Sequence, residues 1–393
     1  KTGVKEASGT PREFTTITVT DGIAMGHQGM KSSLASRDVI ADSVELTMRG
    51  HCYDAMVCLA GCDKSLPGMM MVMLRLNVPS VFMYGGSILP GKFKGKDVTV
   101  IDVFEAVGTN ASGEMSDEDL HELECVACPS AGSCGGQFTA NTMACVSEAV
   151  GTNASGEMSD EDLHELECVA CPSAGSCGGQ FTANTMACVS EAIGLALPGS
   201  AGAPAPYETR DEYAVASGKA VMDLIEKNLR PRDIVTRKSF ENAARIVAAS
   251  GGSTNAGLHL PAMAHECGID FSLEDVCEIF KTTPYIADLK PGGKYVAKDM
   301  FDIGGVPVLM KALLDGGYLH GDCMTVTGKT IAENLKDVVF PTDQDVIYPV
   351  SNPITPTGGV VGLKGSLAPD GAIVKVAGLH SLQFTGTARC FDC

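Results

Sequence analysis

Hydrophobic and polar positions in the first ninety residues alternate between strand-like runs and helical spacing. Apolar residues at 55–60 and 78–84 form short continuous runs bounded by turn residues, which predict buried strands. Residues 16–20 alternate in the manner of a further strand. Between these runs, Ser36 precedes a segment with helical apolar spacing, and Pro67 suits the first turn of another helix. Strands separated by helices predict an α/β fold on a parallel sheet whose strands end at one rim.

The pattern changes toward the C-terminal end of the chain. Helical spacing continues at about 211–227 and 239–249, but beyond residue 340 short β-like runs are separated by turns with Pro and Gly. We therefore expect a parallel-sheet α/β N-terminal domain with flanking helices over 1–340. Residues 341–393 would be the beginning of a β-barrel-like C-terminal domain.

A direct repeat interrupts the N-terminal domain. Residues 106–148 recur as 149–191 without a single difference over 43 positions. Copies of an old structural repeat diverge because each meets different neighbours. The identity therefore indicates a recent duplication or an assembly error. We expect one copy to occupy its place in the fold and the other to be extruded, and we favour the second copy for that place.

Composition and charge limit the possible partners. The net charge is −19 with scattered acidic residues, which argues against nucleic acid. No apolar run approaches 18 residues and no signal peptide is visible, which argues against a membrane. Sixteen Cys in a long chain favour thiols with metal-binding or catalytic roles in a reducing compartment, the cytoplasm or, in a eukaryote, an organelle matrix. The chain starts at Lys1 and stops at Cys393, and we interpret it as a fragment at both ends.

The turn after the second predicted strand concentrates the candidate chemistry. Cys62, Asp63 and Lys64 place a thiol, a carboxylate and an amine side by side. A thiol suits iron, and a carboxylate suits magnesium. Lys64 is either an ordinary cation or a neutral, desolvated amine that becomes an oxygen ligand after reaction with carbon dioxide. Asp21 ends the first predicted strand and should converge on this turn. The alternative is a capped turn with a half-buried Cys.

Two further helix starts carry polar groups after glycines. Cys134, repeated as Cys177, lies in a Gly-rich turn that opens a helix, where a thiol has a lowered pKa and can bind metal as a thiolate. Ser253, Thr254 and Asn255 follow two glycines at another helix start, an arrangement that suits a carboxylate. In the alternative interpretation Ser253 only caps that helix.

Several long motifs resemble one family, the dihydroxy-acid dehydratases and their sugar-acid dehydratase relatives. Together they cover nearly the whole chain apart from the extra copy. They are residues 20–26, 36–43, 61–68, 134–143, 251–255, 325–330 and 367–371. Residues 84–91 resemble the branched-chain enzymes of this family more than the sugar-acid ones.

The resemblance implies an iron–sulfur cluster. Carried over by position, Cys62 and one of Cys134 or Cys177 look like cluster ligands. Ala131 stands where some members have an additional Cys, which favours the [2Fe-2S] branch over the [4Fe-4S] branch. The family's first cluster Cys would lie upstream of Lys1.

The resemblance also implies a magnesium site and a reaction. Asp21, Asp63 and Lys64, the last as a carbamate, look like magnesium ligands, and the completing Glu and the base Ser would lie beyond Cys393. The implied activity is that of a hydro-lyase, most simply of branched-chain amino-acid synthesis, which converts a 2,3-dihydroxy carboxylate to a 2-oxo acid. The alternatives are a sugar-acid dehydratase or a non-catalytic fragment. The implied partners are a small dihydroxy acid and, for the full-length protein, a second copy.

Overall fold

The computed structural model describes residues 1–24, 28–127, 178–379, 383 and 385–387. Before residue 128 the elements are α1 (Thr2–Glu6), α2 (Asp21–Ala24), η1 (Gln28–Ser32), α3 (Ser33–Gly50), β1 (Met56–Ala60), α4 (Ser65–Leu76), β2 (Ser80–Tyr84), β3 (Gly91–Phe93), β4 (Lys96–Val98), α5 (Val100–Ala111) and α6 (Asp117–Val126). After residue 177 they are α9 (Thr182–Ala192), α10 (Glu208–Glu226), α11 (Pro231–Ile234), α12 (Arg237–Ala249), α13 (Ala256–Glu266), α14 (Leu273–Thr282), α15 (Ala297–Asp302), α16 (Val306–Asp315), α17 (Ile331–Asn334), β5 (Val360–Gly365) and β6 (Ala368–Lys375).

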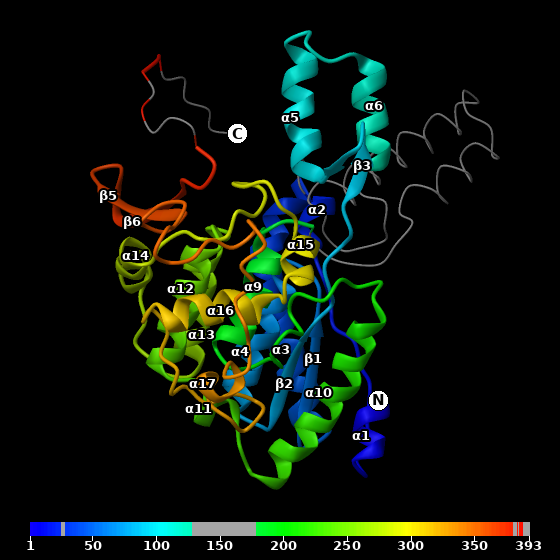
Figure 1. Ribbon diagram of the computed structural model, residues 1–393. Helices are drawn as coiled ribbons and strands as arrows, with labels where there is room; N and C mark the ends of the chain where they lie inside the picture. Colours follow the sequence, from blue (N-terminus) through cyan, green and yellow to red (C-terminus); the bar gives the residue numbers. More distant parts are fainter. Residues whose placement is uncertain (25–27, 128–177, 380–382, 384, 388–393) are drawn as a thin grey trace, which may run out of the picture.

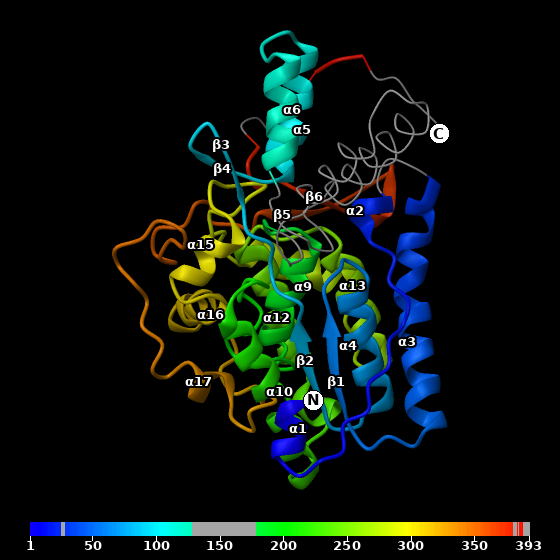
Figure 2. The same cartoon turned by 90° about the vertical axis from the view of Figure 1, so that its right-hand side faces the viewer.

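A pair of parallel strands lies at the centre of the helices. β1 and β2 pair in parallel from Met56 opposite Ser80 to Ala60 opposite Tyr84. A parallel bridge from Phe82 to Ala196 extends β2 on its other side. Helices α4 and α10 pack against the two strands, and both strands point toward α2 (Figures 1 and 2). The two predicted strands and their parallel pairing are therefore confirmed, within a mixed helix and strand architecture.

The third predicted strand is wrong. Residues 16–20 form no strand, and Asp21 opens the short helix α2 instead of ending a strand. Alternation alone does not make a strand, because its backbone groups need a partner strand. The side chain of Ile17, which alternation would bury, is 51% exposed. β1 is also only half-buried, since Val57 and Leu59 face outward.

The two predicted helices beside the strands exist but begin earlier than expected. α3 starts at Ser33, a turn before Ser36, and its inner face is the predicted stripe with Ile40, Val44 and Met48. α4 starts two residues before Pro67. Pro is tolerated anywhere in the first turn, since those N–H groups have no partner in the helix.

The core surrounds α4, which is buried on almost every side. Its apolar residues include Met70, Met71 and Met73, and unbranched methionine fills irregular gaps between helices. Helices α3, α9 and α13 cover α4. α9, from the second copy of the repeat, is buried along its full length. None of the described helices is long and apolar enough to cross a lipid bilayer.

The described part of the first copy has a different position. Helices α5 and α6 stand side by side away from the main body, joined to it through β3 and β4 (Figure 1). They form a small separate core that includes Phe93, Val98, Val103 and Leu123. The structure thus describes the beginning of the first copy and the end of the second.

The β-like runs predicted after residue 340 form a hairpin. β5 and β6 pair antiparallel from Val360 opposite Lys375 to Gly365 opposite Ala368. The hairpin packs on α14. Two strands do not close a barrel, so the described residues show no barrel.

Candidate functional site

The turn after β1 lies at the rim where the parallel strands end. Ala60 and Tyr84 are the last residues of β1 and β2 and are register partners. The turn following β1 runs into α4, whose N-cap position is Lys64. Gly85 N donates to Ala60 O at 2.8 Å, so the turns after the two strands are held against each other. This is the edge of an open α/β sheet at which ligands usually bind.

Asp21, Asp63 and Lys64 converge at this rim. Lys64 Nζ donates to Asp21 Oδ2 at 2.8 Å and to Asp63 Oδ2 at 2.9 Å. The two carboxylate oxygens can therefore be no farther apart than the sum of these distances, which is below ~6 Å and within reach of one metal ion. Ser33 at the start of α3 donates to the other oxygen of Asp21. The predicted convergence is confirmed, although Asp21 arrives on a helix and not on a strand.

The three groups are charged side chains in a buried place. The side chains of Lys64, Asp21 and Asp63 are 6%, 3% and 10% exposed. Burial together with the neighbouring Asp21 raises the pKa of Asp63 to about 7. Burial alone would also raise the pKa of Asp21, but hydrogen bonds with Asp63, Lys64 and Ser33 outweigh it, so that pKa is lowered. The two carboxyls thus differ, as expected for two acids that share one counter-charge.

Lys64 is a cation in this arrangement. Burial alone would lower its pKa, but the charge of Asp63 and hydrogen bonds to both aspartates raise it. Of our two interpretations of Lys64, an ordinary cation or a neutral amine that becomes a carbamate, the structure has the ordinary cation in an ion pair. The carbamate remains a prediction.

The predicted carboxylate-binding segment reaches the same place. Asn255, at the N-cap position of α13, donates from Nδ2 to Asp63 Oδ2 at 3.2 Å and to Thr182 Oγ1 at 2.9 Å. Ser253 Oγ lies 2.8 Å from the same Thr182 oxygen. Thr254 is half-buried beside them. Ser253 does not cap α13 at its N-cap position; its Oγ accepts from Asn255 N at 3.2 Å.

Thr182 was not predicted as a site residue. It is the first residue of α9 and comes from the second copy of the repeat. A helix start after glycines was visible at this point of the sequence, but nothing local indicated that it would meet Ser253 and Asn255 some seventy residues later. Its counterpart in the first copy, Thr139, lies outside the described residues.

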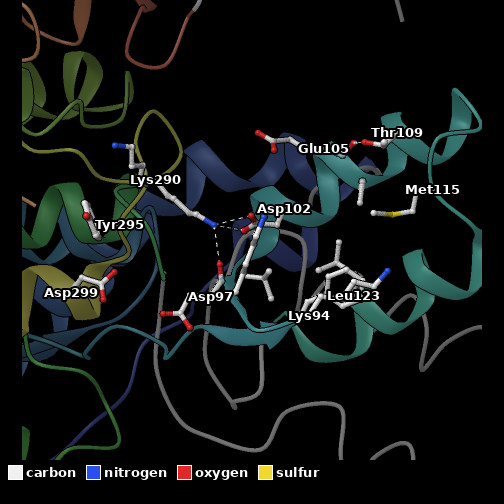
Figure 3. Close-up of a pocket in the computed structure, with 15 residues that line it drawn as sticks. Lys94, Asp97, Asp102, Glu105, Thr109, Met115, Leu123, Lys290, Tyr295 and Asp299 are labelled. Atoms are coloured by element: carbon white, nitrogen blue, oxygen red, sulfur yellow. Dashed lines mark hydrogen bonds and ion pairs between the residues drawn. The ribbon is translucent and has the colours of Figure 1, made fainter. Parts of the chain in front are cut away.

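A separate cavity lies between α5, α6 and the loop around Lys290. Its volume is about 670 Å³, and its lining includes Lys94, Asp102, Leu123, Lys290 and Tyr295 (Figure 3). Lys290 Nζ donates to both carboxylate oxygens of Asp102 at 2.7 Å each. None of the predicted site residues lines this cavity.

Comparison with known proteins decides the family. The model of the dihydroxy-acid/6-phosphogluconate dehydratase N-terminal domain matches residues 1–155 and again 150–334. The model of the C-terminal domain of the same family matches residues 345–393. The chain belongs to the dihydroxy-acid/6-phosphogluconate dehydratase family. The two N-terminal matches overlap at residues 150–155, just after the second copy of the repeat begins at residue 149.

The curated relatives compared with this chain are named dihydroxy-acid dehydratase. The chain is 71% identical to the dihydroxy-acid dehydratase of Parvibaculum lavamentivorans over its whole length. It is 65% identical to that of Dinoroseobacter shibae and 51% identical to that of Mycobacterium leprae. All of this chain is covered in each comparison, but only 61%, 61% and 63% of the respective relative. The chain therefore spans about three fifths of the length of these dehydratases.

The predicted cluster residues of this family member are only partly described. Cys62 is fully buried in the turn, where Ser65 Oγ accepts from its backbone N–H at 3.0 Å. Cys134 and Cys177 lie outside the described residues. The iron–sulfur cluster remains a prediction.

The acidic cluster of Asp21, Asp63 and Lys64 offers oxygen ligands, which suit a hard cation. Two buried carboxylates share one positive charge, now supplied by Lys64, and hard oxygens are what magnesium takes. In the described part of the chain, no three His, Cys, Asp or Glu side chains come together as a metal-binding group. A third ligand from this cluster would therefore have to be Lys64 after losing its charge.

Proposed function

We propose that this chain carries the magnesium-binding part of a dihydroxy-acid dehydratase. The reaction is the removal of water from a 2,3-dihydroxy carboxylate to give a 2-oxo acid. The substrate proposed first is 2,3-dihydroxy-3-methylbutanoate, converted to 3-methyl-2-oxobutanoate in the synthesis of valine, leucine and isoleucine. The observation that carries the proposal is the convergence of Asp21, Asp63 and Lys64 at the strand ends. The names of relatives at 65–71% identity support it.

The proposed metal ligands are Asp21, Asp63 and, as a carbamate, Lys64. Magnesium bound there would stabilise negative charge on the carboxylate and C2 oxygen of the substrate. Lys64 is held as a cation by the two aspartates. It would become neutral, and so able to react with carbon dioxide, only when another cation balances the two carboxylates.

The remaining polar groups of the site would bind and orient. Asn255 holds Asp63 with its amide N–H, which fixes the direction of that carboxylate. The hydroxyls of Thr182 and Ser253 lie next to the amide and can donate to an oxygen of the substrate. Because Asp63 and Lys64 are almost fully buried, the ionic contacts here are screened little by water.

We also propose an iron–sulfur cluster on Cys62 and one of Cys134 or Cys177, of the [2Fe-2S] type in preference to [4Fe-4S]. The support is the position of Cys62 at the rim, in the same turn as Asp63 and Lys64. Anaerobic reconstitution of single Cys-to-Ser variants tests it. Iron content and visible absorption should fall for Cys62→Ser and for only one of the two repeat cysteines. Cys52, which is exposed, gives the control variant. Unchanged iron in Cys62→Ser would refute the assignment.

A second candidate substrate class comes from the family itself. The family description includes 6-phosphogluconate dehydratase, so a sugar acid is the alternative substrate. We expect the fragment to be inactive alone, so the test is 2-oxo acid formation by the completed, full-length protein from 2,3-dihydroxyisovalerate and from a panel of aldonates, with Lys64→Arg as the inactive control. Faster turnover of an aldonate would reverse our choice. Absence of turnover with every substrate would favour a non-catalytic fragment.

Three coarser features complete the proposal. We divide the chain into residues 1–340 and 341–393, a division supported by family-model matches that end at 334 and resume at 345. The working protein is proposed to be a homodimer in the cytoplasm, or in an organelle matrix in a eukaryote. Size-exclusion chromatography with light scattering tests the homodimer.

A further inference from the structure

Arg37 is a half-buried cation near the acidic cluster. It lies on α3 four residues after Ser33, the residue that donates to Asp21, and residues four apart share one face of a helix. Its side chain is 14% exposed, and its nearest described carboxylate, that of the outward-facing Asp38, is 3.4 Å away. Among the described residues, its Nε is buried without a hydrogen-bond partner.

His259 has the matching position on α13. It lies four residues after Asn255, the residue that donates to Asp63, and it is fully buried. Arg37 Nη1 lies 3.4 Å from His259 Nδ1. A guanidinium can only donate, so Nδ1 accepts and the imidazole proton is on Nε2. That Nε2 is also buried without a partner in the described part of the chain.

The contact joins the two helices that hold the carboxylates. α3 holds Asp21 and α13 holds Asp63, each one turn away from the Arg37–His259 contact. Two buried donors without acceptors make this contact unfavourable for stability, and apolar side chains of similar size would cost less. A feature that lowers stability at a site is better explained by a role in that site than by packing.

We infer that the Arg37–His259 contact fixes the spacing between Asp21 and Asp63, which makes His259 a positioning residue of the cation site. The inference rests on the proposed function in one respect, that the cation is magnesium. Magnesium demands near-ideal octahedral geometry. The affinity of a site for Mg²⁺ therefore depends more strongly on the separation of its two carboxylates than the affinity for Ca²⁺, which accepts flexible geometry.

The test is the affinity of the chain for Mg²⁺, measured by calorimetry in bicarbonate buffer. His259→Leu should weaken binding about tenfold, as expected for the loss of a residue that orients metal ligands. Its thermal midpoint should change little, because the unpaired Nε2 donor is removed while Arg37 Nη1 loses its acceptor, and the two effects oppose each other. His259→Asn keeps an acceptor at the position of Nδ1 and should retain most of the affinity. His265→Leu, the same change at an exposed position of α13, is the control.

A double variant adds a second criterion. Arg37→Met combined with His259→Leu should bind Mg²⁺ no more weakly than either single variant, because one contact is lost in all three. A His259→Leu chain with a lower thermal midpoint and unchanged Mg²⁺ affinity would show a purely structural role and overturn the inference. Absence of Mg²⁺ binding in the parent chain would instead overturn the proposed function, and the inference with it.

Discussion

Lys64 and Lys290 make similar contacts in different surroundings. Lys64 is shared between Asp21 and Asp63 at the strand ends, where all three side chains are at most 10% exposed. Lys290 donates to both oxygens of Asp102, but it lines a cavity, and the two side chains are 13% and 25% exposed (Figure 3). Each lysine faces two carboxylate oxygens, so the main difference is access to water.

Burial changes what such a contact can do. The largest single influence on the pKa values of Lys64, Asp21 and Asp63 is loss of water, which opposes charge on every one of them. The cluster therefore favours a change of charge, whether by uptake of a proton or of a metal ion. The Lys290 contact retains part of its hydration and serves as a link between the loop and α5. The difference assigns the chemistry to the first site and a structural role to the second.

The largest effect is expected from removing the charge of Lys64. Lys64→Met leaves two buried carboxyls without a counter-charge and should lower the free energy of unfolding by about 3–5 kcal/mol. Lys64→Arg keeps the charge and should lose much less. Urea denaturation of the metal-free chain measures both. Equal losses in the two variants would show that shape, and not charge, holds the cluster.

The next effect is a pH dependence of stability that comes from Asp63. The pKa of Asp63 is raised to about 7 in the folded chain, against about 3.9 when unfolded, so the folded chain binds the proton more tightly. Its contribution to stability is full below pH ~4 and is lost as the pH rises to about 7, with a slope of at most about 1.4 kcal/mol per pH unit. Asp63→Asn should reduce this slope in metal-free denaturation curves. The part that remains belongs to Glu191, because burial raises the pKa of that carboxyl to about 8. A parent chain without the slope would contradict the raised pKa.

Breaking the contact between Lys290 and Asp102 should have a smaller effect on the free energy of unfolding. Lys290→Met removes charge-assisted hydrogen bonds to the partly exposed Asp102 and should cost about 2 kcal/mol of unfolding free energy. Lys294→Met in the same loop is the control, since that side chain is 73% exposed and lies 3.8 Å from Asp288. A loss for Lys290→Met equal to that for Lys64→Met would remove the distinction between the two lysines.

The smallest effect is expected from excising one copy of the repeat. Deleting 128–170 leaves seven residues between Ala127 and Gly178, which span about 23 Å when extended. Ala127 O accepts from Gly91 N, and a side chain at Gly178 would meet Ile88, three residues earlier. The short link therefore suffices. The link shortens from 50 residues to 7, which is nearly three halvings, and each doubling of a link costs only about 0.6 kcal/mol, so stability should rise by about 1.7 kcal/mol or less.

Circular dichroism and thermal melting test the excision. The shortened chain should keep the helical content of the described elements and a midpoint at or above that of the parent. A chain that fails to fold would show that the extra residues are needed. The experiment also removes the ambiguity between Cys134 and Cys177, because the two copies are identical and only one such Cys remains.

The sequence predicted the residues of the site better than the helices and strands that position them. Motif and spacing correctly placed Asp63 and Lys64 at the end of a parallel strand, because that position follows from local signals, and Asp21 does meet them there. The route of Asp21 was wrong, since an alternating segment without a partner strand gives no strand. The outcome for Cys134 and Cys177 remains a prediction.

Residues that act across long separations were missed. Thr182 joins the site through partners seventy-one and seventy-three residues away, and Lys290 reaches Asp102 across 188. The residues around Thr182 and Lys290 carry no local pattern that indicates which distant residue each will contact, because these contacts depend on how whole helices pack. The C-terminal hairpin was predicted as strands, but a barrel requires more strands than the described residues provide.

Burial of α4 on all sides has a consequence for the order of synthesis. Its neighbour α3 has already been made when α4 appears, but α13 follows about 190 residues later, which at ~5–20 residues per second is on the order of 10–40 s. During that interval a methionine-rich surface and the charged groups Asp63 and Lys64 lack their final cover. The nascent chain is then a natural client for chaperones that bind apolar segments. Its yield in a cell should depend on the speed of translation between these two helices.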